Sequence, residues 1–134
     1  MSPKLSNYTT FAVPTDDMER VRAVLEKLLG IEMHGVASGA WGDYYTTPNR
    51  PRPKISVFLN MKTDEEGPYW TEDDYRDYPL LVSIDDAQTP DKLNAMISRI
   101  LSDTQLGAVL VRKTFRDDNG NEVDEHGNLI ESSE

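Results

Sequence analysis

The sequence predicts an α+β fold in which two helices pack on a mixed, mostly antiparallel curved sheet. Residues 16–29 and 90–101 carry apolar side chains at helical spacing, and each segment follows a helix-start signal. Short runs of β-branched and aromatic residues, separated by turn signals, surround these two segments. The expected order is βαβββ followed by βαββ, within a single domain of residues 8–125.

The first expected strand is residues 8–13, and Pro14 ends it. Thr15 can cap the helix that follows, and Gly30 stands where a left-handed C-cap is needed. The apolar face of this helix consists of Met18, Val21, Leu25, Leu28 and Leu29.

The next three expected strands are residues 31–36, 43–47 and 55–59. Residues 60–79 have no regular pattern, and a connection of this length is usually functional or mobile. The second half continues with a strand, a helix that starts at Thr89-Pro90, another strand and a hairpin turn, at residues 80–84, 90–101, 106–113 and 118–121.

The two ends of the chain are expected to be poorly ordered. Residues 1–7 are a polar, flexible lead-in, and residues 126–134 are an acidic, disordered tail. Residues 1–7 also lack the apolar run of a secretory signal.

The charge of the chain limits its partners. The net charge is −10 and the calculated pI is 4.6, which disfavours nucleic acid and anionic membranes. The same charge favours a cationic small molecule, a basic protein or a divalent metal. The chain has no cysteine, which excludes disulfides and thiolate chemistry and makes the cytoplasm the default compartment. We expect no membrane-spanning segment.

No arrangement typical of an enzyme was found in the sequence. His34 and His126 are the only histidines, and neither belongs to a motif. There is no phosphate-binding loop and no nucleophile elbow. The acids of residues 117–125 do not match a calcium-binding loop, because His126 stands where the last glutamate is required. We therefore predict no catalytic residue, no cofactor and no metal.

The aromatic and acidic segment at residues 69–78 is the best candidate for binding. Aromatic faces attract cations, carboxylates add negative charge, and Tyr and Trp are typical interface anchors. The alternative is that the rings only fix a long loop to the sheet. The candidate residues, with three aromatic residues of a neighbouring strand that could line the same concavity, are Tyr69, Trp70, Asp73, Asp74, Tyr75, Asp77, Tyr78, Trp41, Tyr44 and Tyr45.

Three stretches of the sequence resemble the vicinal oxygen chelate superfamily, which contains glyoxalase-like and bleomycin-resistance-like proteins. The stretch Phe11-Ala12-Val13-Pro14-Thr15-Asp16-Asp17, with Leu28-Leu29-Gly30-Ile31-Glu32 after it, is similar to the opening strand, helix and "LG" turn of that family. Residues 81–86 resemble the start of its second module, and residues 115–121 resemble its closing hairpin.

The resemblance implies a curved sheet, and in the family's enzymes a divalent metal is held by His and Glu from four strands. By this resemblance three of those ligands would fall near Tyr8, Ser56 and Pro79, and only Asp124, in the last strand, is an acid at a ligand position. One carboxylate cannot hold such a metal. A ferredoxin-like sandwich is the second choice of fold.

These observations leave three functional hypotheses. The first is a non-enzymatic binding protein that sequesters a cationic or aromatic target. The resemblance to bleomycin-resistance-like proteins implies this function, and it also implies a homodimer. The second is an immunity protein, antitoxin or phage-type inhibitor that neutralises a basic protein. The third is a degenerate metalloenzyme of the same superfamily.

Overall fold

The computed structural model describes residues 6–38, 42–48, 53–87, 89–124, 126 and 128–129. Its elements in chain order are β1 (Ser6–Val13), α1 (Met18–Leu29), β2 (His34–Ser38), β3 (Gly42–Thr46), β4 (Lys54–Leu59), β5 (Met61–Asp64), β6 (Gly67–Trp70), the 3₁₀ turn η1 (Asp73–Tyr75), β7 (Leu80–Asp85), α2 (Pro90–Ser102), β8 (Val109–Arg116) and β9 (Glu122–Val123).

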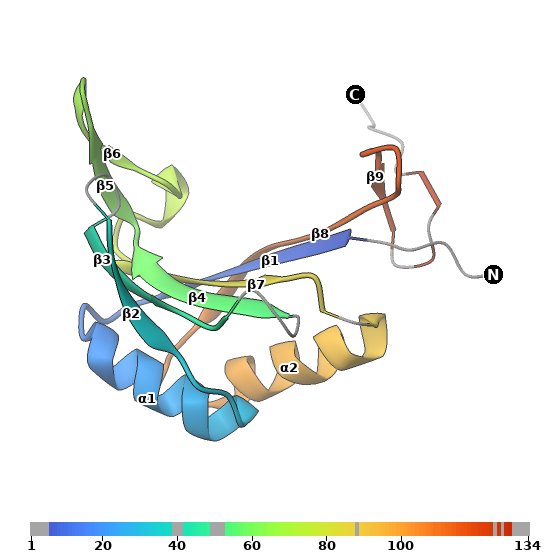
Figure 1. Cartoon of the computed structure of the whole chain (residues 1–134), viewed down its shortest axis with the longest axis horizontal. Coiled ribbons are helices and arrows are strands. Elements are labelled where there is room, and N and C mark those ends of the chain that lie inside the picture. The colour runs from blue at the N-terminus through green and yellow to red at the C-terminus, as the bar shows by residue number, and fades with distance from the viewer. Residues whose placement is uncertain are drawn as a thin grey trace.

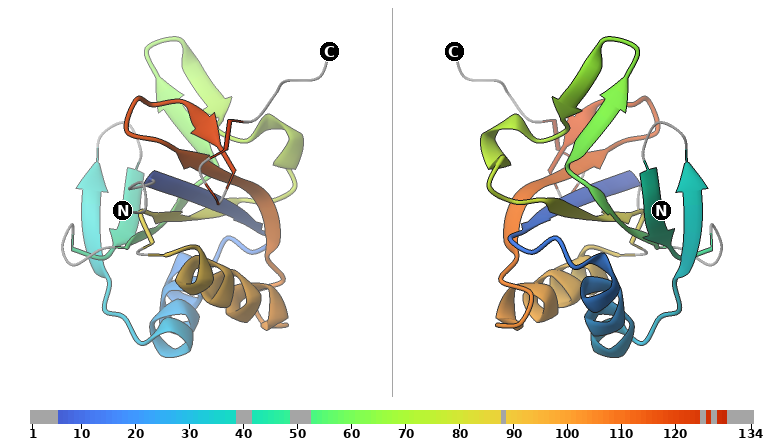
Figure 2. Two further views of the ribbon diagram at one scale, coloured as in Figure 1. Left: turned by 90° about the vertical axis from the view of Figure 1, so that its right-hand side faces the viewer. Right: turned by 90° about the vertical axis from the view of Figure 1, so that its left-hand side faces the viewer.

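Seven strands form one curved, open sheet in the order β2-β3-β4-β7-β1-β8-β9, and β5 and β6 form a separate hairpin. Each pair of neighbouring strands is antiparallel. Both helices lie on one face of the sheet, and the β5–β6 hairpin rises on the other side (Figures 1 and 2). The predicted α+β class is therefore confirmed.

The four central strands follow the order β4-β7-β1-β8, so that β1 and β4 are parallel to each other with β7 between them. Helix α1 lies between β1 and β4 in the chain, and α2 connects β7 to β8. This interleaving is the split βαβ arrangement of ferredoxin-like folds. Membership of the vicinal oxygen chelate superfamily stays a prediction.

The helices begin and end where local signals allow. Asp17, and not Thr15, caps α1, because the Asp17 carboxylate accepts the Arg20 N–H at 3.2 Å. The Thr15 hydroxyl instead accepts the N–H of Asp17, the residue just before the helix. Gly30 ends α1 with φ of +66°. Thr89 caps α2 by accepting the Lys92 N–H at 3.1 Å.

The main core lies between the helices and one face of the sheet. Strands β1, β4 and β7 alternate, so every second side chain points into this core. Its fully buried large side chains are Phe11, Val13, Val21, Leu25, Ile55, Val57, Leu80, Val82, Ile84, Leu93 and Ile100. Neither α1 nor α2 covers the opposite face of the sheet, and the candidate site lies there (Figure 1).

The segment at residues 60–79 contains more regular structure than the sequence indicated. Met61 pairs with Trp70 and Asp64 with Gly67. These pairs form a hairpin of two four-residue strands, where the sequence indicated no regular structure. Gly67 has φ of +114°, a value that suits glycine at this turn.

Strand β8 begins at Val109 and not at residue 106 as predicted. The Asp103 carboxylate accepts the N–H groups of Gln105 and Leu106 and so holds these residues in a turn.

Two turns of the same pattern, D-x-x-G-N, close the chain. In the first turn the Asp117 carboxylate accepts the backbone N–H groups of Asn121 and Asn119, both at 2.9 Å. Asp124 accepts the N–H groups of Asn128 and His126 in the same way. Leu129 then forms an isolated bridge with Val123, and the rest of the predicted tail lies outside the described residues.

These turns predict a pH dependence. The N–H of Asn121 lowers the pKa of Asp117, and the N–H of Asn128 lowers the pKa of Asp124. A carboxylate whose pKa is lowered by folding stabilises the folded form above its unfolded pKa of about 3.9, and this stabilisation is lost as the pH falls. We expect the amide resonances of Asn121 and Asn128 to shift below pH about 4 in an NMR titration. Asp117→Asn should remove the acid transition at Asn121 only, and unchanged transitions at both residues would contradict the assignment.

Candidate functional site

A second, smaller apolar cluster lies on the sheet face away from the helices. Ala12, Phe58 and Leu81 are buried there on three neighbouring strands. The half-buried side chains that pack on them are Tyr44, Tyr75, Tyr78, Val109 and Val111. The rings of Tyr75 and Tyr78 meet edge to face, with 5.7 Å between centroids. Two predicted site residues of the 69–78 segment therefore point inward and fix that segment to the sheet.

Asn60 holds the same segment by its backbone and its side-chain amide. It is fully buried, and its side-chain nitrogen donates to the carbonyl oxygens of Glu72, Tyr75 and Tyr78 at 2.9–3.3 Å. Its side-chain oxygen accepts the N–H of Glu72 at 2.8 Å. Its backbone N–H donates to Pro79 and its carbonyl accepts from Thr71. One residue, through its side chain and its backbone, thus fixes the path of residues 71–79.

An ion pair connects the segment to strand β8, which is separated from β4 by β7 and β1. Arg112 of β8 donates to both carboxylate oxygens of Glu72, one of them at 2.8 Å. The Glu72 side chain is 8% exposed and the Arg112 side chain is 60% exposed. The Nζ atom of Lys62 lies 4.7 Å from the centre of the Phe58 ring. Burial lowers the pKa of the Lys62 ammonium group.

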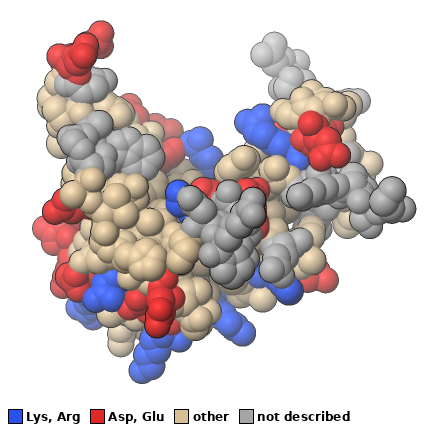
Figure 3. All heavy atoms as spheres, in the orientation of Figure 1, with Lys and Arg blue, Asp and Glu red and all other residues tan. Residues whose placement is uncertain are grey.

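The remaining side chains of the segment point outward. We call residues 61–77, which include β5, β6 and η1, the hairpin arm. Tyr69 is 42% exposed, Trp70 is half-buried, and Asp73, Asp74 and Asp77 are exposed. Glu65 and Glu66 are exposed at the turn of the hairpin, where acidic side chains gather at the tip of the arm (Figure 3).

Apolar side chains are also exposed at the base of the arm. Leu59 is 36% exposed and Met61 is 43% exposed. Met61 and Trp70 are register partners in the hairpin, so both project from one of its faces, and Lys62 and Tyr69 project from the other. One face of the hairpin therefore carries the half-buried Trp70 ring and the exposed Met61 thioether.

The three aromatic residues expected near the arm separate in the structure. Tyr44 packs in the apolar cluster under Tyr75 and Tyr78. Tyr45 faces the helices instead, where its hydroxyl donates to Glu19 and the Arg22 guanidinium lies 5.1 Å from its ring. Trp41 lies outside the described residues.

Sequence reasoning missed Asn60, Leu59 and Met61. Asn60 breaks a strand-like run between Leu59 and Met61, and an asparagine there is a turn signal. That signal could have placed a hairpin at residue 61, although it could not have shown which carbonyls the amide binds.

The positions that the superfamily resemblance assigns to metal ligands do not form a ligand set here. The Ser56 hydroxyl is 2.8 Å from the Thr46 hydroxyl, and the Asp124 carboxylate is used by its own turn. Within the described part of the chain, no three His, Asp or Glu side chains gather in a way that could hold a metal ion. The expected absence of a metal stays a prediction.

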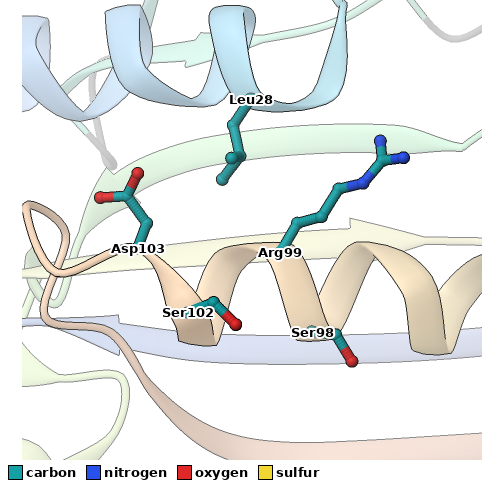
Figure 4. Close-up of a pocket in the computed structure, with 5 residues that line it drawn as sticks. All are labelled: Leu28, Ser98, Arg99, Ser102 and Asp103. Carbon is teal, nitrogen blue, oxygen red and sulfur yellow. The ribbon is translucent and has the colours of Figure 1, made fainter.

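A cavity of about 360 Å³ lies in the helical layer, away from the arm. Leu28 of α1 and four residues near the end of α2 line it: Ser98, Arg99, Ser102 and Asp103 (Figure 4). The Arg99 and Asp103 side chains diverge on either side of Leu28, so they do not converge on one point. None of the predicted site residues lines this cavity.

Among the described residues, neither helix has the length and apolar character needed to cross a bilayer. No protein-family model matches the chain, and no curated protein matches its sequence.

Proposed function

We propose that this chain is a non-enzymatic binding protein that sequesters a cationic target, and that the target is a basic protein held by the hairpin arm. One observation carries the proposal. Glu72, Tyr75 and the adjoining Tyr78 are turned inward and fixed, while Tyr69 and the acids of the projecting arm are exposed and Trp70 is half-buried.

The charge of the arm supports a cationic target. Its 17 residues contain seven Asp or Glu and two Lys or Arg, which gives 2 − 7 = −5, half of the net charge of −10. Arg76 pairs with Asp73 within the arm, but this exposed pair is largely screened by solvent. A field of this sign speeds the approach of a basic partner and suppresses acidic ones.

The shape of the arm supports a protein over a small basic molecule. Small-molecule sites are concave, and the rings of Tyr69 and Trp70 stand on a projecting hairpin. Aromatic and Met side chains are enriched at protein interfaces, and the arm exposes Tyr69 and Met61. An inhibitor of a basic effector, acting in the cytoplasm, is the form of this function that we favour.

The proposal is tested by capture from native lysate. The immobilised wild-type protein is compared with the triple variant Asp73→Asn, Asp74→Asn, Asp77→Asn, and retained proteins are quantified by mass spectrometry. We expect a basic protein to be retained by the wild type and about tenfold less by the variant, because each rim carboxylate contributes up to about 1 kcal/mol.

The matched control changes the net charge by the same amount elsewhere. Glu32, Asp91 and Asp118 are exposed and lie outside the arm, and their replacement by the corresponding amides should leave retention unchanged. Equal losses in both triple variants would mean that only net charge matters. Retention by the arm variant equal to that of the wild type would reject the arm as the binding element.

A further inference from the structure

Strand β2 forms one border of the large sheet (Figure 2). It pairs on one side with β3, in a regular register that runs from His34 opposite Thr46 to Ser38 opposite Gly42. Within the described ranges no strand pairs with its outer side. Such an edge presents a row of backbone N–H and C=O groups to any chain that can align with it.

The two borders of the sheet are protected differently. At the opposite border β9 has only two residues, and Val123 is covered by its bridge to Leu129. Short edge strands and covering segments are common protections against pairing with another chain, as are Lys, Pro and β-bulges. Strand β2 is five residues long, contains no Lys or Pro, and has no bulge against β3.

We propose that a second copy of this chain pairs antiparallel with β2 about a two-fold axis, so that two seven-stranded sheets become one. The strand is centred on Val36, and the two-fold axis places Val36 opposite Val36 of the second copy. The same register places Gly35 opposite Ala37 and His34 opposite Ser38. Gly35 and Ala37 are both exposed and small, which allows close approach of the two backbones.

Charge selects the second copy over the basic partner as the occupant of this edge. Residues 34–38 contain no Asp, Glu, Lys or Arg, although the whole chain carries a net charge of −10. Two copies that pair there place no like charges opposite each other, and an uncharged strand offers a basic protein no electrostatic attraction. This inference does not depend on the proposed function of the arm.

The absence of cysteine makes the register directly testable by disulfide trapping. Residues directly opposite in an antiparallel pair have Cα atoms about 4.5–5.5 Å apart, within the range that a disulfide spans. Val36→Cys should therefore cross-link to itself under mild oxidation. Gly35→Cys and Ala37→Cys should each fail to cross-link alone, and an equimolar mixture of the two should cross-link. A Cβ at Gly35 would meet the Tyr45 ring at 3.5 Å, an ordinary contact, so this variant is expected to fold.

Ser102→Cys, exposed at the end of α2, measures disulfides formed by random collision. We expect at least about tenfold more cross-linked dimer from Val36→Cys than from this control, because opposed Cβ vectors favour the bond. Circular dichroism confirms that each variant is folded. Cross-linking of Val36→Cys at the control level overturns the proposal. Cross-linking of Gly35→Cys alone as efficient as that of the mixture overturns the two-fold register.

Discussion

Replacing Asn60 with alanine is expected to lower the free energy of unfolding by about 3 kcal/mol and to release residues 71–79 from the sheet. The side chain is fully buried and makes four hydrogen bonds, three to carbonyl oxygens and one to the N–H of Glu72. Alanine would remove the partner of the Glu72 N–H and of the Tyr78 carbonyl, whereas the carbonyls of Glu72 and Tyr75 still accept from the N–H groups of Tyr75 and Tyr78. Each buried group left unpaired costs about 1–3 kcal/mol unless water enters. Denaturant unfolding gives the loss, and hydrogen exchange at the Glu72 amide reports the release.

Asn7 provides the matched control for this variant. It is also buried, and its amide pairs with the N–H and carbonyl of Ala87, both at 2.9 Å. Asn7→Ala should destabilise the protein by a comparable mechanism while leaving the Glu72 amide protected in the native state. If Asn60→Ala unfolds at the wild-type denaturant concentration with its Glu72 amide still protected, the assigned role of Asn60 is wrong.

Alanine at both Tyr69 and Trp70 is expected to weaken binding of the captured partner by about 3 kcal/mol, which is more than a hundredfold in Kd. Partly exposed Tyr and Trp side chains are the usual anchors of protein interfaces, because they bury a large area at low entropic cost when a partner covers them. Calorimetric titration of the purified partner gives the affinity. Thermal unfolding should change little, because neither ring belongs to the buried clusters.

A double variant of two other exposed apolar residues separates anchoring from general hydrophobicity. Leu101 is 43% exposed on α2 and Leu110 is 36% exposed on β8, and both lie outside the arm. Leu101→Ala with Leu110→Ala should bind the partner as the wild type does. A loss of affinity in this control equal to that of the arm variant would contradict the anchoring role of Tyr69 and Trp70.

The helices and most strands could be predicted because their signals are local. Asp17, Gly30 and Thr89 act on backbone groups within four residues, and the apolar spacing of Val21 and Leu25 defines the buried face. The fold class follows from the order of these elements. The order of strands in the sheet does not, because it depends on pairings between residues such as Thr10 and Ser83 that are far apart in the chain.

The candidate site was less predictable for the same reason. The aromatic segment at 69–78 is visible in the sequence, but its division into inward Tyr75 and Tyr78 and outward Tyr69 depends on bonds from Asn60. Tyr44 and Tyr45 are neighbours in a strand, so their side chains take opposite faces of the sheet. That separation follows from strand alternation alone and could have been predicted.

The central claim, that the outward side chains of the arm hold a basic protein, is tested most directly by mapping the contact surface. The ¹⁵N-labelled protein is titrated with the purified captured partner, and changes in amide resonances are followed residue by residue. We expect the changes to concentrate at residues 59–77, with the amides of α1 and α2 unaffected. Changes concentrated on the helical layer, with the arm unperturbed, would contradict the claim.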